Sequence, residues 1–361
     1  MNTVLDPTKT HEVQVFEHNE QFLTSRFSPC GRYVFGSTPD RNVYRHDLDT
    51  GEKVALTGHP SWVNAMAFQI EGKTLFTGDY WGRIHAWRYD QPEPHTLMEL
   101  DQAHDGLLRD MALTLDGRIL LTCGRDKVAR AWNADDLSLI REFVGHEDDI
   151  YSLAISPDGQ SLVTGDQLGV VKEWNIESGK HVRDIDASGL LSDPYKNGFV
   201  KMGGVRHMAF DHEGKRLVCT GMVKGTSITF SVGSLGILEF DFESGEKIRE
   251  MSPEGGGFMM GALYLPDGTL VTAAEGPHGK PHGGLWFWKD GASTEPLFLL
   301  QKFLQTKKID IHPDGLHLTA PHFHALGHGG NGKRPGDYTT NHGSVRVYRM
   351  TAKPEAKAKK K

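Results

Sequence analysis

The sequence predicts an all-β protein, a closed β-propeller of seven blades. Three observations predict this fold: a turn that recurs seven times, strand-like segments on both sides of each copy, and an unpaired segment near the start of the chain. The turns are centred on Gly31, Gly72, Gly117, Gly159, Gly214, Gly268 and Gly315. Their spacing of 41 to 55 residues is typical of propellers and related repeat proteins.

Short alternating segments flank each turn, such as residues 63–68 before Gly72 and residues 74–77 after it. Alternation of apolar and polar side chains with a period of two indicates β-strands. Glycine suits the hairpin between them because it adopts a positive φ without steric strain. In each repeat a third segment ends in an aromatic residue, as residues 84–87 do in the second repeat. A further turn leads to a fourth segment, such as residues 53–56 in the first repeat. Each repeat therefore predicts one four-stranded blade.

Two dipeptides recur within this frame. The first is Gly-His, found as Gly58-His59 and Gly145-His146, with Ala103-His104 as a variant. The second is an aromatic-polar pair at the end of the third strand, found as Trp87-Arg88, Trp132-Asn133, Trp174-Asn175 and Trp288-Lys289. In these motifs the chain resembles the WD40-repeat family over residues 11–350, which we expect to form a single domain. The resemblance implies a rigid propeller that binds protein or peptide partners.

In that family, four side chains of one blade form a hydrogen-bonded set. The resemblance implies this set in blade three, as His104, Thr122, Asp126 and Trp132. Trp81 stands at the aspartate position of blade two, and Leu168 stands there in blade four. We therefore expect the complete set in blade three alone.

Ring closure follows from the number of strands. The last blade ends at its third strand, residues 344–350, whereas residues 12–16 precede the first turn without a partner. We predict that this N-terminal strand joins the last blade as its outer strand, because closing the ring removes exposed sheet edges. Residues 1–10 are then an N-terminal extension, and residues 351–361 form a disordered lysine-rich tail.

Four segments are longer than the repeat requires, and in the resembled family all four would lie on one face. They are residues 184–204, 222–235, 274–284 and 320–342. Loops on a rigid scaffold commonly carry function. We predict that these loops form a partner-binding crown over blades five to seven. The alternative is that they are tolerated insertions without a partner, since added loop length costs little free energy.

The mouth of the central channel on that face is a second predicted binding surface. Aligned inner strands place Leu23, Asn64, Arg109, Tyr151, Arg206, Met260 and Lys307 at equivalent positions, which we call the channel mouth. Three cations at this mouth would attract an acidic peptide or a carboxylate. Trp62, Tyr80 and Trp81 fall in loops on the same face and are candidate partner anchors. Packing between blades is the alternative for Trp62.

The loops of blades six and seven are rich in histidine. Neutral imidazoles bind zinc, copper and nickel, so His278, His282, His322, His324 and His328 are candidate transition-metal ligands. The alternative is that these side chains only form hydrogen bonds with a glycine-rich backbone. His312 and His317 we interpret as ordinary turn and strand residues. No other cofactor is expected.

Composition narrows the possible functions. A net charge of −7 argues against duplex DNA as a partner and makes RNA improbable. Neither a signal peptide nor an apolar stretch long enough to span a membrane is visible. Three widely spaced cysteines suit a reducing compartment, so we expect a cytoplasmic protein. The compact repeats also suggest a bacterial source and a monomeric folding unit.

No sequence motif for a catalytic nucleophile, a phosphate-binding loop or a paired-carboxylate site stands out. We therefore predict a non-catalytic interaction scaffold whose partner lies on the loop-decorated face. The alternative is a propeller enzyme, a lyase or hydrolase, that uses the histidines of blades six and seven as acid, base or metal ligands.

Overall fold

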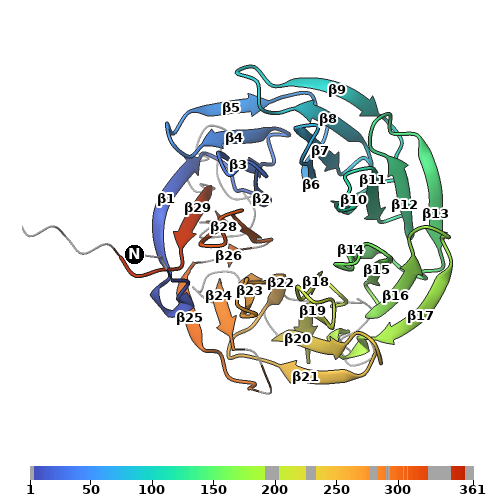
Figure 1. Ribbon diagram of the computed structural model, residues 1–361, viewed down its shortest axis with the longest axis vertical. Coiled ribbons are helices and arrows are strands. Elements are labelled where there is room, and N and C mark those ends of the chain that lie inside the picture. The colour runs from blue at the N-terminus through green and yellow to red at the C-terminus, as the bar shows by residue number, and fades with distance from the viewer. Residues whose placement is uncertain are drawn as a thin grey trace, which may run out of the picture.

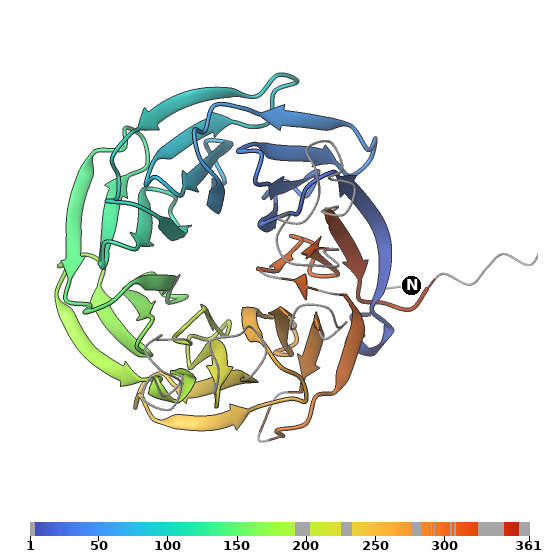
Figure 2. The same cartoon turned by 180° about the vertical axis from the view of Figure 1, so that it is seen from behind.

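The predicted seven-bladed propeller is confirmed by the computed structural model of the chain. Figures 1 and 2 show the strands arranged in a ring, with successive blades following one another around a single axis. The structure describes residues 4–191, 203–224, 233–275, 283–289, 291, 293–303, 305–306, 308–323 and 343–353. Within these ranges, no helix is both long enough and apolar enough to cross a membrane.

Blades one to four have the same arrangement. In each, four consecutive antiparallel strands lie side by side, ordered from the ring axis to the outer edge. Blade one contains β2 (Thr24–Phe27), β3 (Tyr33–Ser37), β4 (Val43–Asp47) and β5 (Lys53–Leu56). Blade two contains β6 (Val63–Gln69), β7 (Thr74–Asp79), β8 (Ile84–Arg88) and β9 (His95–Leu100). Blade three contains β10 (Leu108–Leu113), β11 (Ile119–Gly124), β12 (Val128–Asn133) and β13 (Leu139–Val144). Blade four contains β14 (Ile150–Ile155), β15 (Ser161–Asp166), β16 (Val170–Asn175) and β17 (His181–Asp186).

Blades five to seven complete the ring, and a short extra strand, β26, joins the last two. Blade five contains β18 (His207–Phe210), β19 (Arg216–Val223), β20 (Ser234–Asp241) and β21 (Lys247–Met251). Blade six contains β22 (Phe258–Tyr264), β23 (Leu270–Glu275), β24 (Gly283–Trp288) and β25 (Phe298–Phe303). The remaining strands are β26 (Gln305–Thr306), β27 (Asp310–Ile311), β28 (His317–Phe323), β29 (Gly343–Arg349) and β1 (His11–His18). Two short 3-10 helices, η1 (Pro7–Lys9) and η2 (Ser188–Leu190), lie outside the blades.

The two ends of the described chain meet in blade seven. Strand β1 runs antiparallel to β29, with His11 opposite Arg349 and His18 opposite Gly343. In Figure 1 the blue β1 lies beside the red β29. The segment 12–16 that lacked a partner in the sequence falls inside β1, so it occupies the outer position of this blade.

Two faces of the ring can be distinguished from turn contacts. The turn after the second strand lies against the segment leading into the inner strand: the N–H of Tyr80 donates to the Trp62 carbonyl in blade two, and that of Arg125 donates to Leu107 in blade three. We call this the upper face. The glycine turns between first and second strands lie at the opposite strand ends and form the lower face, where Gln69 donates to the Gly117 carbonyl of the next blade.

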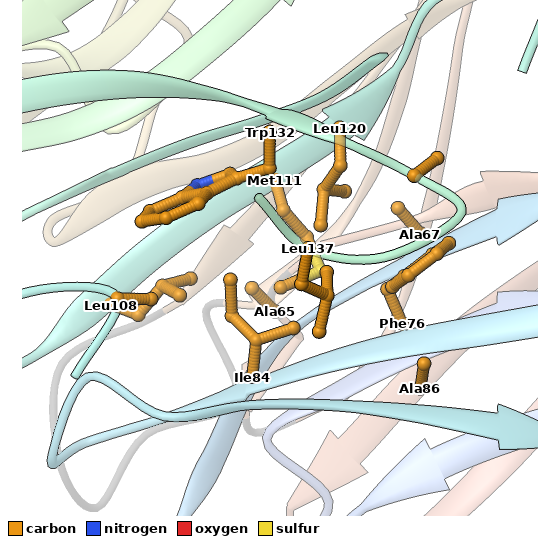
Figure 3. Close-up of a cluster of buried hydrophobic side chains, with 12 residues drawn as sticks. Ala65, Ala67, Phe76, Ile84, Ala86, Leu108, Met111, Leu120, Trp132 and Leu137 are labelled. Carbon is orange, nitrogen blue, oxygen red and sulfur yellow. The ribbon is translucent and has the colours of Figure 1, made fainter. Parts of the chain in front are cut away.

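The hydrophobic core lies mainly between neighbouring blades. Figure 3 shows the cluster between blades two and three, in which Phe76 and Ile84 face Met111 and Trp132. Burying each such side chain contributes about 1.5–3 kcal/mol. Gly78 allows this close approach, since a Cβ there would lie 2.6 Å from the Leu108 side chain. The sequence alternation thus produces blades whose apolar faces pack against each other around the ring.

Candidate interaction site

Among the residues that the structure describes, the hydrogen-bonded set of the repeat occurs in three blades, not one. In blade three, His104 contacts Thr122 through Nε2 (2.7 Å) and Asp126 through Nδ1 (2.9 Å). The indole N–H of Trp132 donates to the same Thr122 hydroxyl at 2.9 Å. Equivalent contacts join His59, Asp79, Thr77 and Trp87 in blade two, and His146, Asp166, Thr164 and Trp174 in blade four.

The expectation that blades two and four lack the set was therefore wrong. Their aspartates lie at the end of the second strand, two residues before the positions held by Trp81 and Leu168. Asp79 turns one oxygen to His59 (3.0 Å), while the other accepts the backbone N–H of Trp81 (2.9 Å). One carboxylate thus orients the histidine and caps the turn. In blade three a glycine occupies this place, and Asp126 in the turn performs the same task.

At the channel mouth, three predicted residues come together. The Tyr151 ring lies between two guanidinium groups, with Arg109 and Arg206 each 4.1 Å from its centroid. Arg206 also lies 4.8 Å from the centroid of the Phe258 ring. Cation–π contacts of this kind stabilise a cation against an aromatic face. Phe258 was not among the predicted residues, because it follows a glycine-rich segment that gives no strand signal.

The two arginines differ in how their charge is balanced. Arg109 forms an ion pair with Asp149 at 3.3 Å, and its carbonyl accepts a hydrogen bond from Asn64 at 2.9 Å. Arg206 has no ion pair with any residue that the structure describes, whereas a buried Nε without a hydrogen bond is common to both arginines there. Burial lowers the pKa of Arg206, an effect that Tyr151 opposes. The charge of Glu275 also opposes the lowering, but within the described residues no carboxylate forms an ion pair with Arg206.

Beneath the mouth, an ion pair joins two blades that are not neighbours. The Lys308 ammonium of blade seven lies 2.6 Å from the Asp110 carboxylate of blade three. Asp110 also accepts the backbone N–H of Leu153 at 3.2 Å, which links blade three to blade four. Burial raises the pKa of Asp110, but Lys308 and other cations outweigh it and hold this pKa below its usual value. The predicted Lys307 lies outside the described residues.

The three aromatic candidates of blade two lie on the upper face, with unequal exposure. Trp81 is 59% exposed and Trp62 is 42% exposed, whereas Tyr80 is half-buried. The rings of Trp62 and Tyr80 contact each other with centroids 5.4 Å apart. Trp81 borders a groove of about 1090 Å³ between blades two and three, together with Arg83 and Arg130. An exposed indole beside a groove is a suitable anchor for a partner side chain.

The predicted metal ligands are only partly described. His278, His282, His324 and His328 lie outside the described residues, so the metal hypothesis for these loops stays a prediction. His322 is buried in β28, where its Nε2 lies 2.9 Å from the Tyr348 hydroxyl. The crown also falls largely outside the described ranges, as do residues 354–361 of the predicted tail.

Comparison with known proteins agrees with the fold. The family model for the WD domain, G-beta repeat, matches residues 52–88, 95–133 and 137–175. These three segments contain the three hydrogen-bonded sets. The ring of blades and the repeated set together define a repeat-built β-propeller. These three segments are WD40 repeats, which agrees with the resemblance to the WD40-repeat family that the sequence predicted.

Three curated relatives illustrate the likeness. U3 snoRNP-associated protein-like EMB2271 from Arabidopsis thaliana is 30% identical over 129 residues, covering 36% of this chain and 26% of that protein. Target of rapamycin complex subunit wat1 from Schizosaccharomyces pombe is 28% identical over 110 residues, covering 30% of this chain and 34% of that protein. The tRNA (guanine-N(7)-)-methyltransferase non-catalytic subunit wdr4 from Xenopus laevis is 27% identical over 139 residues, covering 37% and 34%. The matches span about a quarter to a third of these relatives.

Proposed function

We propose that the protein is a non-catalytic interaction scaffold that binds an acidic segment of a protein partner on its upper face. Two of the similar proteins carry names that describe subunits of larger assemblies, and one of these names specifies a non-catalytic subunit. That agrees with a rigid disc that presents surfaces to other proteins. The free thiols of the described chain suit a reducing compartment such as the cytoplasm.

The observation that carries this proposal is that Arg206 forms no ion pair within the described residues. Its guanidinium is held between the rings of Tyr151 and Phe258, so its position is fixed before any ligand arrives. A carboxylate that pairs with a fixed arginine avoids part of the entropy loss that ordering a flexible side chain requires. A partner glutamate or aspartate is the group that would neutralise this cation.

The aromatic residues of blade two would then flank the charged contact. Asn64 in blade two bonds to the Arg109 carbonyl, so the segment that carries Trp62 adjoins the mouth. We propose that apolar side chains of the partner contact Trp62 and the exposed Trp81 while the acidic group enters the mouth. The arginine contact would provide orientation and the indoles would provide buried apolar area.

Fluorescence anisotropy with a short labelled glutamate-rich peptide tests the proposal. The full chain should bind this probe with an affinity that falls as salt is added, because the contact is electrostatic. Arg206→Met should weaken binding about tenfold or more, equivalent to about 1.4 kcal/mol. Circular dichroism would verify that the variant is folded, and Arg109→Met provides a second variant at the mouth.

Arg118→Met is the matched control. Arg118 belongs to a glycine turn of the lower face, and its side chain is 83% exposed. Removing this charge changes the net charge equally but leaves the mouth intact, so binding of the glutamate-rich peptide should not change. Equal affinities of the Arg206 and Arg118 variants would contradict the proposed site.

A further inference from the structure

The lower turn of blade seven differs chemically from its counterparts. In blade three, the hydroxyl of Thr114 donates to Asp116 two residues later, at 2.6 Å. Blade seven has His312 in place of the hydroxyl, followed by Asp314, and a second histidine, His317, begins β28. The imidazoles and the carboxylate converge: one ligand atom from each residue can be chosen so that all lie within 4.8 Å of one another.

The hydrogen bonds of His312 determine which of its nitrogens carries a proton. Its Nε2 lies 2.8 Å from the carbonyl oxygen of Gly31, in blade one. A carbonyl can only accept, so Nε2 must carry the hydrogen. Nδ1 accepts the backbone N–H of Asp314 at 3.1 Å, which requires an unprotonated nitrogen. Neutral His312 therefore presents the lone pair of Nδ1 within the cluster.

This tautomer leaves electron-rich atoms facing each other. The bare Nδ1 of His312 lies 3.0 Å from Oδ1 of Asp314, and neither atom can donate a hydrogen to the other. The second oxygen of Asp314 accepts a hydrogen bond from Nδ1 of His317 at 2.7 Å, so a metal bound there would replace that proton. Oδ1 of Asp314 also accepts the backbone N–H groups of Leu316 and His317, but its contact with the lone pair of His312 Nδ1 is unfavourable unless a cation lies between the two atoms.

We propose that His312, Asp314 and His317 form a binding site for a divalent transition-metal ion. Two imidazole nitrogens and one carboxylate oxygen are a donor set suited to zinc, and also to copper or nickel. Ligand atoms on one tetrahedral zinc are about 3.3–3.6 Å apart, given metal–ligand distances of about 2.0–2.2 Å. The two observed separations are 3.0 and 2.7 Å, so the side chains would have to move apart slightly around an ion, and a water molecule would complete the coordination.

The Gly31 carbonyl supports this assignment. A metal-bound histidine commonly donates its other ring N–H to a backbone carbonyl, which fixes the ring and its tautomer. Here that carbonyl belongs to blade one, whereas the three ligands belong to blade seven. The ion would therefore strengthen the contact between the first and last blades, where the ring closes.

Neighbouring charge limits the expected affinity. Arg349 is the cross-strand partner of His317, and paired residues on adjacent strands lie on the same side of the sheet. The positive charge of Arg349 disfavours a cation nearby. Binding also replaces the hydrogen bond from the Asp314 N–H to His312. We therefore expect micromolar rather than nanomolar affinity for zinc.

Equilibrium dialysis of the full chain against Zn²⁺, with metal content measured by plasma mass spectrometry, tests the site. A Cys30→Ser background excludes the exposed thiol as a ligand. His317→Gln should remove one zinc per chain or weaken that zinc at least about tenfold, since a ligand matters at least as much as its supporting hydrogen bonds. Asp314→Asn is the second variant and should act in the same direction.

His212→Gln is the matched control, because His212 occupies a lower turn of blade five and its Nε2 lies 3.0 Å from the Leu265 carbonyl. This variant should bind as much zinc as the parent. Replacing His278 and His282 together shows whether any additional zinc belongs to the histidine-rich loops. The site is overturned if the parent binds no zinc, or if His317→Gln and Asp314→Asn bind as much zinc as the parent.

Discussion

Blades two to four and blades five to seven form the same ring but are stabilised by different polar contacts. In the first group, each blade has a histidine, an aspartate, a threonine and a tryptophan in one buried set. In the described part of the second group, these sets are replaced by individual contacts. Blade six retains the bond from Trp288 to Thr272 (2.9 Å), and blade five carries Glu239, which bonds to Arg249 and to Tyr264 of blade six.

This comparison shows which features the propeller fold requires and which belong only to some of its repeats. Alternating strands, glycine turns and apolar contacts between blades occur around the whole ring. The four-residue set occurs in the three segments that the family model matches. A blade without the set can still fold if an ion pair or a tyrosine hydroxyl satisfies its buried groups, because unsatisfied buried polar atoms are the main penalty.

The largest expected loss of stability comes from breaking the contact between the two groups of blades. Lys308→Met leaves the Asp110 carboxylate buried without its cation and should lower the free energy of unfolding by about 3–5 kcal/mol. Urea denaturation measures this loss. Lys172→Met is the control, because it removes an ion pair with Asp184, which is half-exposed. This variant should lower the free energy of unfolding by less than about 1 kcal/mol. Similar losses would contradict a central role for the buried pair.

Removal of one threonine hydroxyl compares the two groups directly. Thr122→Val leaves both Trp132 and His104 without their shared partner, so we expect a loss of about 2–4 kcal/mol. Thr272→Val leaves only the Trp288 indole unsatisfied and should lose about half as much. Both values come from denaturant midpoints at constant m-value. If Thr272→Val loses more stability than Thr122→Val, the complete four-residue set does not stabilise its blade more than the single Trp288–Thr272 bond.

Acid should destabilise both groups of blades through buried neutral histidines. Burial lowers the pKa of His85 in blade two and of His207 in blade five to about 4. The unfolded chain binds these protons at about pH 6.5, so stability is complete above that pH and falls as the pH drops toward 4.

Thermal melts between pH 7 and 4 measure this effect. His85→Phe should remove about 2 kcal/mol of the stability loss that the parent shows between pH 7 and pH 5. His207→Asn keeps an acceptor for the Ala262 N–H and should reduce the acid-induced loss of stability by a similar amount. If only one variant changes the profile, the acid sensitivity belongs to one group of blades.

The smallest expected effect on stability is that of Trp81→Ala. An exposed side chain at a turn contributes within about 0.5 kcal/mol to folding. The same variant should weaken binding of the glutamate-rich peptide when that peptide also carries a leucine, because the indole would lose apolar contact. Paired melting and anisotropy measurements separate the two effects. A large drop in melting temperature would show that Trp81 packs within the fold.

Most of the fold was predictable, because turn glycines and strand alternation are local signals repeated seven times. The position of the aspartate was not, since a carboxylate at residue 79 can reach the same histidine as one placed two residues later. Recognising this from sequence would have required considering both positions at each turn.

The channel mouth was predictable only in part. Arg109, Tyr151 and Arg206 followed from aligned inner strands, whereas Phe258 and Lys308 did not. Phe258 follows a run of glycines, and Lys308 contacts a residue of a distant blade. Lys308 is adjacent to the predicted Lys307, which lies outside the described residues. Contacts across the ring depend on its closed geometry, which local patterns do not encode.

The most direct test of the account is a crystal structure of the protein with the glutamate-rich peptide bound. The account predicts a peptide carboxylate within hydrogen-bond distance of the Arg206 guanidinium on the upper face, with the chain passing toward Trp62. A peptide seated on the lower face, or bound at the rim with Arg206 uncontacted, would contradict it.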